Sequence, residues 1–341
     1  MPRSNDGTAV KSERFFGRLS RAARGGGSAS LTTVLIAFAA NFVVAVAKSV
    51  AAVVTGSASM LAEAAHSWAD TGNEVFLLIA SRRSRRPPDS AHPLGHGREA
   101  YVWSLLAALG LFVVGAAVSV THGVQELSHP SPATDYVVGY VVLAVSFVLE
   151  GFSFLRAVGQ ARRTAALMER DLLGAVMATS DPTLRAVFAE DSAALIGLAI
   201  AAVGLGAHEL TGSSTPDAVG SILVGILLAA VAMVLIDRNR AFLIGEEANP
   251  RLRAAAIRAL LAEPEVARVT YLRLEFVGPR VVSVVGDVDL TGDDTESHVA
   301  VRLRALEAKL DASPAVAGTV LSLSAPDEPS LTERSRHRRR G

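Results

Sequence analysis

The sequence predicts an all-α membrane domain of six transmembrane helices, followed by a small cytosolic α+β domain of ferredoxin-like type with the element order α-β-β-α-β. Three observations predict this architecture. The chain contains six long apolar stretches, its Lys and Arg residues concentrate in alternate connections between them, and its pattern changes after residue 237. Half of the 341 residues are hydrophobic and 19% are charged, whereas a soluble domain has about 25% charged residues.

Each apolar stretch is long enough to cross a bilayer, whose hydrocarbon core requires roughly 20 residues of helix. The stretches lack the alternation of polar and apolar residues that would indicate barrel strands. Helices satisfy their backbone hydrogen bonds internally, as a lipid-facing chain must. The predicted spans, which together form a membrane domain of residues 31–237, cover residues 31–54, 59–81, 99–122, 136–158, 184–207 and 217–236.

The positive charges predict the orientation. Six Lys or Arg residues lie in the segment 1–30, five in 82–98 and five in 156–185, whereas the three other connections contain none. Because Lys and Arg accumulate on the cytoplasmic side, both termini are predicted to be cytoplasmic. The Ala-, Arg- and Val-rich composition is typical of bacterial proteins, so we expect the cell (cytoplasmic or inner) membrane.

Residues 238–325 have the pattern of a small cytosolic α+β domain. Helical patterns cover residues 250–261 and 296–310, and a final strand is predicted at 316–323. Two β-rich segments, 266–276 and 281–290, flank the turn sequence Val277-Gly-Pro-Arg280. The order α-β-β-α-β favours an α+β fold. The basic segments 1–30 and 326–341 are predicted to be disordered tails.

The chain has no cysteine. Disulfides, thiolate metal sites and cysteine nucleophiles are therefore excluded. A metal site must use His, Asp, Glu, Asn or backbone oxygen. No nucleophile or metalloprotease motif accompanies the acids described below, so we expect no enzyme, no organic cofactor and no nucleic-acid partner.

Ionisable residues inside membrane helices are costly and indicate function. The second span contains Glu63, His66, Asp70 and Glu74. His66 and Asp70 are four residues apart and share one helix face, where they can supply two ligands of a tetrahedral Zn²⁺ site. The alternative is a buried His–Asp hydrogen bond that holds helices together.

The fifth span contains two adjacent acids, Glu190 and Asp191. A divalent ion shared by His66, Asp70 and Asp191 would neutralise this cluster. The alternative is an ion pair with Lys48, the one lysine within the predicted spans. For Glu150 and Asn41, contacts between helices are the favoured interpretation.

The first cytoplasmic loop contains Asp89, His92 and His96. An acid and two imidazoles within eight residues, on a loop shaped by Pro and Gly, predict a second metal site. The alternative is a solvated loop that binds nothing.

These motifs resemble the cation diffusion facilitators, the zinc-transporter family. The segment from Gly56 to Asp70 is similar to the family's second-helix sequence, and the segment from His92 to Arg98 resembles its first cytoplasmic loop. Ser180-Asp-Pro-Thr183 and Glu190-Asp-Ser-Ala-Ala194 are most similar to the zinc transporter nine-like branch. The resemblance covers residues 31–325.

The sequence departs from the family pattern at two places. Most members carry a His four residues before the fifth-helix Asp, where this chain has Val187. Three explanations compete: Glu190 supplies the fourth ligand, water or Asn73 completes the shell, or the site is broken. The cytosolic domain has His298 as its one histidine before the tail, so the resemblance implies a dimerisation module without the regulatory zinc site of better-known bacterial members.

The resemblance implies a homodimer embedded in membrane lipid that exports a divalent cation, Zn²⁺ above all, from the cytosol in exchange for protons. Fe²⁺, Co²⁺ and Mn²⁺ stay open because thiolate ligands, which would select among metals, are absent. A membrane scaffold that acts through its cytosolic domain without transport is the alternative from another class.

Overall fold

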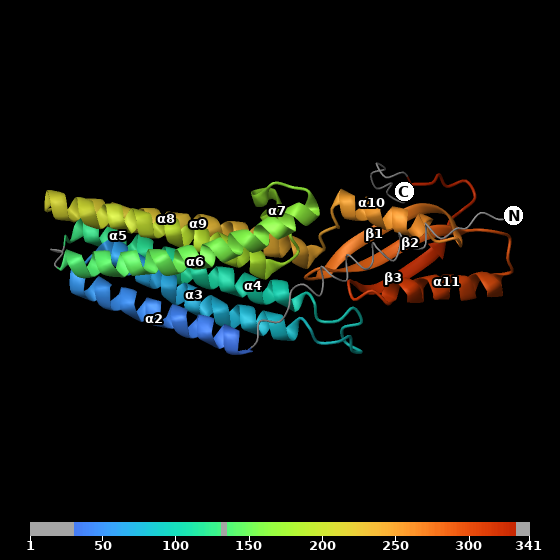
Figure 1. Cartoon of the computed structure of the whole chain (residues 1–341), viewed down its shortest axis with the longest axis horizontal. Coiled ribbons are helices and arrows are strands. Elements are labelled where there is room, and N and C mark those ends of the chain that lie inside the picture. The colour runs from blue at the N-terminus through green and yellow to red at the C-terminus, as the bar shows by residue number, and fades with distance from the viewer. Residues whose placement is uncertain (1–30, 131–134, 332–341) are drawn as a thin grey trace. The chain divides into compact units, whose positions relative to one another are not determined.

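The computed structural model describes residues 31–130 and 135–331 (Figure 1). The predictions for the segment 1–30 and for the end of the basic C-terminal tail lie outside these residues. The chain divides into two compact units. The helical unit contains Ala29–Arg83 and Glu99–Ala241, and the second unit contains Ser84–Arg98 together with the chain from Phe242 onward. We describe each unit by itself.

Long helices build the helical unit, and their order along the chain agrees with the predicted spans. The third predicted span is one continuous helix with a π-helical segment, η1, in its middle. A short helix that the sequence did not predict, α7, lies in the connection before the fifth span. The elements are α2 (Leu31–Thr55), α3 (Ala58–Arg83), α4 (Glu99–Gly110), η1 (Leu111–Ala117), α5 (Val118–Ser128), α6 (Tyr136–Met168), α7 (Leu172–Ala178), α8 (Pro182–Thr211) and α9 (Thr215–Ile244).

Four helices of the described chain are long and apolar enough to cross a membrane: Glu99–Ser128, Tyr136–Met168, Pro182–Thr211 and Thr215–Ile244. Of α2, the stretch Asn41–Thr55 is apolar but shorter. Helix α3 has 26 residues, but the ionisable side chains along it lower its hydropathy. The count of six spans therefore stays a prediction.

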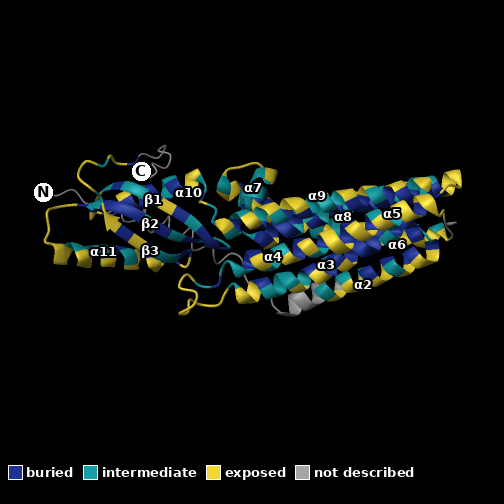
Figure 2. Ribbon diagram, turned by 180° about the vertical axis from the view of Figure 1, so that it is seen from behind, coloured by how far each residue is buried: buried dark blue, intermediate teal, exposed yellow. Residues whose placement is uncertain are grey.

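The buried positions of the helical unit are rich in Ala, and many Val, Leu and Phe residues of its helices are exposed. Figure 2 shows buried and exposed stretches on these helices. One buried cluster contains Ala62, Ala69, Ala193 and Ala232 around larger side chains such as Leu228. Small side chains let helix backbones approach closely, which is how membrane helices associate without a hydrophobic driving force. Exposed Val, Leu and Phe residues on the outer faces suit contact with lipid.

Polar side chains fix the ends of α3 and α8, two helices that carry ionisable residues. Asp217, 1% exposed, accepts hydrogen bonds from the backbone N–H of Ala58 at 2.6 Å and from Ser57 Oγ at 2.9 Å, at the start of α3. Asp181 caps α8, and Gly212 ends it in the left-handed conformation. These contacts set where each helix begins and so which residues reach the interior.

The second unit confirms the predicted order of helices and strands. It contains α10 (Pro250–Leu261), β1 (Val266–Gly278), β2 (Val281–Leu290), α11 (Glu296–Asp311) and β3 (Val316–Leu323). The sheet has the order β1-β2-β3, with β1 and β2 antiparallel and β2 and β3 parallel. Arg280 adopts a positive φ of 63° in the predicted hairpin turn. The ferredoxin-like assignment stays a prediction.

Candidate functional site

The helical unit contains a polar, partly open cavity of about 80 Å³. This volume exceeds the space that one water molecule needs, so it can hold a metal ion with part of its hydration. Four helices, α2, α3, α6 and α8, contribute to its wall. The lining residues are Asn41, Asp70, Asn73, Glu74, Leu77, Glu150, Ser153, Val187, Glu190 and Asp191.

On α3, Asp70 lines the cavity, whereas His66 is not one of the lining residues and lies beside Asp70. His66 is 1% exposed, and its Nε2 lies 3.4 Å from Oδ2 of Asp70. Within the described part of the chain, neither ring nitrogen of His66 nor Oδ1 of Asp70 has a hydrogen-bond partner. Buried polar atoms are nearly always partnered, so these three atoms are candidates for binding a metal ion or a proton. The predicted His66–Asp70 pair is therefore close enough to act together.

On α8, Glu190 and Asp191 both line the cavity. Glu190 is buried and accepts hydrogen bonds from Nδ2 of Asn73 through both carboxylate oxygens, at 2.5 Å to Oε1. Asp191 accepts a hydrogen bond from Oγ of Ser153 at 2.9 Å. Sequence reasoning found the two acids but not these partners, which come from α3 and α6. Asp191 and Asp70 thus face one cavity from two helices.

Val187 also lines the cavity. An isopropyl group cannot bind a metal ion, so this position contributes an apolar wall where the family pattern has a donor. Glu74, which also lines the cavity, accepts a hydrogen bond from Nδ2 of Asn41 at 2.7 Å. The interpretation of Asn41 as a residue that joins two helices agrees with this contact.

Lys48 pairs with acids, although not with those of α8. Its Nζ lies 3.0 Å from Oε2 of Glu63, with both side chains 0% exposed, and 3.8 Å from Oε1 of Glu150. The sequence left a Lys48–acid pair open as an alternative to a metal site. In the structure Lys48 pairs with Glu63 and Glu150 instead, and Glu190 and Asp191 of α8 line the cavity.

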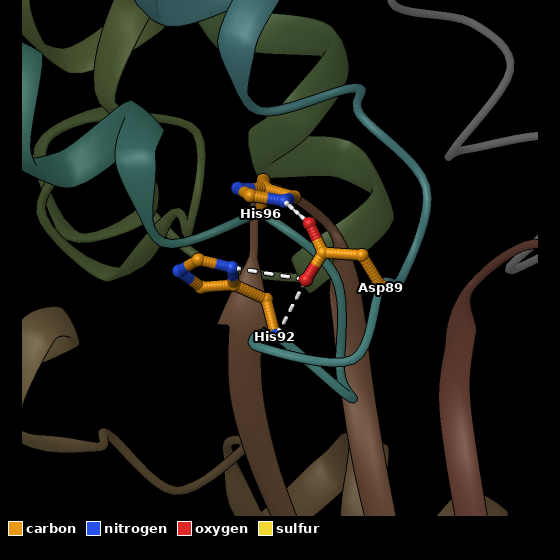
Figure 3. Close-up of side chains that lie close together, drawn as sticks. All are labelled: Asp89, His92 and His96. Carbon is orange, nitrogen blue, oxygen red and sulfur yellow. Dashed lines mark hydrogen bonds and ion pairs between the residues drawn. The ribbon is translucent and has the colours of Figure 1, made fainter.

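The second candidate site lies on the loop Ser84–Arg98, in the other unit (Figure 3). Asp89, His92 and His96 each offer one ligand atom, and these atoms lie within 4.8 Å of one another. Nδ1 of His92 donates to Oδ1 of Asp89 at 3.2 Å, and Nε2 of His96 donates to Oδ2 at 3.0 Å. The two imidazole rings lie 4.1 Å apart, centre to centre. The three predicted loop residues therefore do come together.

Hydrogen bonds to Asp89 hold its carboxyl group in the ionised form. The pKa of Asp89 lies well below its usual range, chiefly because His96 donates to the carboxylate and then because the backbone N–H of His92 does so. Asp89 and His92 are half exposed, whereas His96 is nearly buried. An ionised carboxylate beside two imidazoles is a donor set that suits Zn²⁺.

Backbone contacts within this unit hold the loop. Gly95 adopts a φ of +78°, which only glycine adopts without strain. Gly97 packs so closely on Val277 and Gly278 that no Cβ would fit. Arg98 forms an ion pair with Glu275 of β1. The loop is therefore attached to the sheet at its C-terminal end.

Known proteins match most of the chain. A family model described as the cation efflux transmembrane domain matches residues 34–244. Metal tolerance protein C4 of Arabidopsis thaliana is 37% identical over 233 residues, which are 68% of this chain and 51% of the relative. The proton-coupled zinc antiporter SLC30A9, mitochondrial, is 36% identical in Xenopus laevis and 35% in Homo sapiens, each over 259 residues, 76% of this chain and 46% of the relative. The chain thus spans about half the length of these curated relatives.

Proposed function

The chain belongs to the cation efflux family, the cation diffusion facilitators, in the branch similar to zinc transporter nine, and from this premise we propose that it exports a divalent cation, Zn²⁺ in the first place, from the cytosol in exchange for protons. The matching family and the named relatives are transporters, not enzymes. The chain is a multi-pass membrane protein, and four helices of its described residues are long and apolar enough to span a membrane.

The observation that carries the proposal is the polar cavity among apolar helices. Asp70 and Asp191 line it from α3 and α8, and His66 lies 3.4 Å from Asp70. Carboxylates within membrane helices need a compensating charge, and a divalent cation supplies it. His66, Asp70 and Asp191 are the proposed ligands of the transported ion, with Glu190 as a fourth ligand or as a proton carrier.

Proton exchange follows from the chemistry of these ligands. Imidazole must be neutral and carboxylate must be ionised to bind a metal ion, so binding releases protons and reprotonation releases the metal. A site that opens alternately to the two sides would take up metal and release protons on the cytosolic side. On the other side the reverse exchange would occur. The cargo and the counter-ion thus use the same side chains.

The remaining parts of the proposal concern assembly and place. We propose a homodimer in the cell membrane with both termini in the cytoplasm, in which residues 238–325 form the dimerisation domain. The loop residues Asp89, His92 and His96 are proposed to bind a second metal ion, which is structural or regulatory because the loop lies outside the apolar helices. The physiological cargo is proposed to be Zn²⁺, with Fe²⁺, Co²⁺ and Mn²⁺ as alternatives.

Reconstitution tests the proposal. Proteoliposomes with an acidic interior and a trapped zinc-sensitive dye should accumulate Zn²⁺ as protons leave. Asp70→Ala should abolish this uptake while protein yield is retained, and His298→Ala, a histidine on the exposed face of α11, should have no effect. Wild-type uptake by Asp70→Ala would contradict the proposed site. Uptake of Fe²⁺, Co²⁺ or Mn²⁺ instead of Zn²⁺ would change the cargo, and uptake of none would favour a scaffold.

A further inference from the structure

A buried lysine, Lys48 of α2, lies inside the helical unit, and the proposed transport cycle does not use it. Its side chain is 0% exposed, and an ammonium group within a membrane is costly unless it is paired. Lys48 Nζ lies 3.0 Å from the fully buried Glu63 and 3.8 Å from Glu150. The three charged groups therefore connect α2, α3 and α6.

The two carboxylates are held differently. Glu63 accepts a hydrogen bond from Lys48, and Gly197 of α8 leaves room for its second oxygen, because a Cβ at that glycine would collide with it. Glu150 is 15% exposed, and its contact of 3.8 Å with Lys48 is longer than a hydrogen bond. Glu63 is thus a fixed partner of Lys48, whereas Glu150 is attracted to Lys48 without a hydrogen bond between them.

Glu150 also belongs to the cavity. It lines the wall together with Asp70 and Asp191. Ser153, three residues further along α6 and therefore on the same helix face, donates its hydroxyl hydrogen bond to Asp191. The carboxylate of Glu150 thus has the ammonium group of Lys48 on one side and the acids of the cavity on the other.

We propose that Lys48 is a built-in cation that competes with the transported ion for Glu150. The inference rests on the proposed function of the cavity. When a divalent ion enters, Glu150 moves from Lys48 to the ion and supplies the donor that Val187 lacks, which leaves Glu190 with the role of proton carrier. When the ion leaves, Glu150 returns to Lys48.

Such competition has a physical advantage for transport. A site made only of carboxylates and imidazole would bind the ion tightly and release it slowly, whereas transport requires binding that is also readily reversed. Lys48 stabilises Glu150 in the empty site and so lowers the net affinity for the ion. Close charge pairs at protein interfaces have coupling energies whose low end corresponds to about a tenfold change in affinity.

A set of four full-length proteins tests the competition. All four carry His92→Ala and His96→Ala, which remove zinc binding by the loop. The first has no further change, the second has Lys48→Met with Glu63→Gln, the third has Glu150→Gln, and the fourth has all three substitutions. The paired substitution removes one positive and one negative charge, so the net charge of the region is unchanged. Zinc affinity is measured in detergent by competition with a chromophoric chelator.

The expected pattern is specific to competition. The paired substitution should tighten zinc binding about tenfold, and Glu150→Gln should weaken it about tenfold. In the Glu150→Gln background, the paired substitution should have no effect, because the group that Lys48 competes for is gone. A purely structural role of Lys48 would change affinity equally in both backgrounds, and that result would overturn the inference.

A spectroscopic measurement keeps the test decisive if the paired variant does not fold. Infrared difference spectra upon zinc addition should contain a shifted carboxylate band that disappears in Glu150→Gln, and an identical spectrum in that variant would reject Glu150 as a ligand. The failure of this inference differs from failure of the proposed function. If this inference fails, zinc binding depends on Asp70 but not on Glu150. If the proposed function fails, zinc binding does not depend on Asp70.

Discussion

Zinc binding at the loop of Asp89, His92 and His96 should be steeply dependent on pH, with a slope that the geometry determines. Each imidazole must lose its proton before it binds zinc. Asp89 contributes no proton over the assay range, because hydrogen bonds from His96 and from the backbone of His92 keep its pKa well below the usual range. Two protons are therefore displaced for each ion in acidic solution, and log Kd should change by about 2 for each pH unit there.

The distances between the ligand atoms also indicate how far the loop side chains must move to bind Zn²⁺. Ligands at Zn²⁺ bond lengths of about 2.0 Å in a tetrahedral site lie about 3.3 Å from one another. The ligand atoms of the three residues lie within 4.8 Å of one another, and each imidazole has a ring nitrogen 3.2 or 3.0 Å from one of the two oxygens of Asp89. Small side-chain rotations are sufficient, so binding should not require the loop to unfold.

Isothermal titration with Zn²⁺ between neutral and mildly acidic pH measures the slope. The protein carries Asp70→Asn, so that the proposed membrane site does not contribute. His92→Ala should halve the slope to about 1 and weaken binding, and His298→Ala serves as the matched control. A slope that is the same in the His92→Ala variant, or the absence of stoichiometric zinc at neutral pH, would refute the assignment of the loop as a metal site.

Asp89 itself has a second consequence for pH. Its pKa is depressed in the folded loop, so its contribution to stability is present above the ordinary pKa of Asp. This contribution is lost only as the pH falls through the lower, folded value. Loop order should therefore persist in mildly acidic solution even after zinc has left. Protection of the loop from protease at that pH checks this expectation, and Asp89→Ala should remove the protection.

Three further predictions concern the helices. Glu190→Gln removes a charge from the cavity and breaks the symmetric pairing with Asn73, so zinc transport in proteoliposomes should fall about tenfold or more and lose much of its pH dependence; a wild-type rate and profile would exclude both proposed roles of Glu190. Val187→His adds an imidazole to the cavity wall, so zinc affinity should rise about tenfold or more in chelator competition, and an unchanged affinity would mean that this position does not face the ion. Asp217→Ala leaves the start of α3 without its buried acceptor, which should cost about 1–3 kcal/mol of stability and lower the midpoint of thermal unfolding in detergent, whereas an unchanged midpoint would contradict the capping role.

The sequence by itself determined the elements and the local site. The bounds predicted for α10, β2 and β3 agree with the structure, because Pro at a helix start, a hairpin turn and β-rich runs are signals that act within a few residues. The loop site was predictable for the same reason, since Asp89, His92 and His96 are so near in sequence that a short loop brings them together. The presence of unusual acids in apolar helices was also evident without a fold.

Only the tertiary structure decided which of those ionisable residues meet. Asn73 pairs with Glu190 across 117 positions of the sequence, and Lys48 pairs with Glu63 and Glu150 and not with the acids of α8. Helical periodicity predicts which residues share a face. The rotation of each helix about its axis, and which helices it contacts, depend on packing across the whole bundle. An isolated charge in an apolar helix requires a partner, and only the packed bundle determines which one it has.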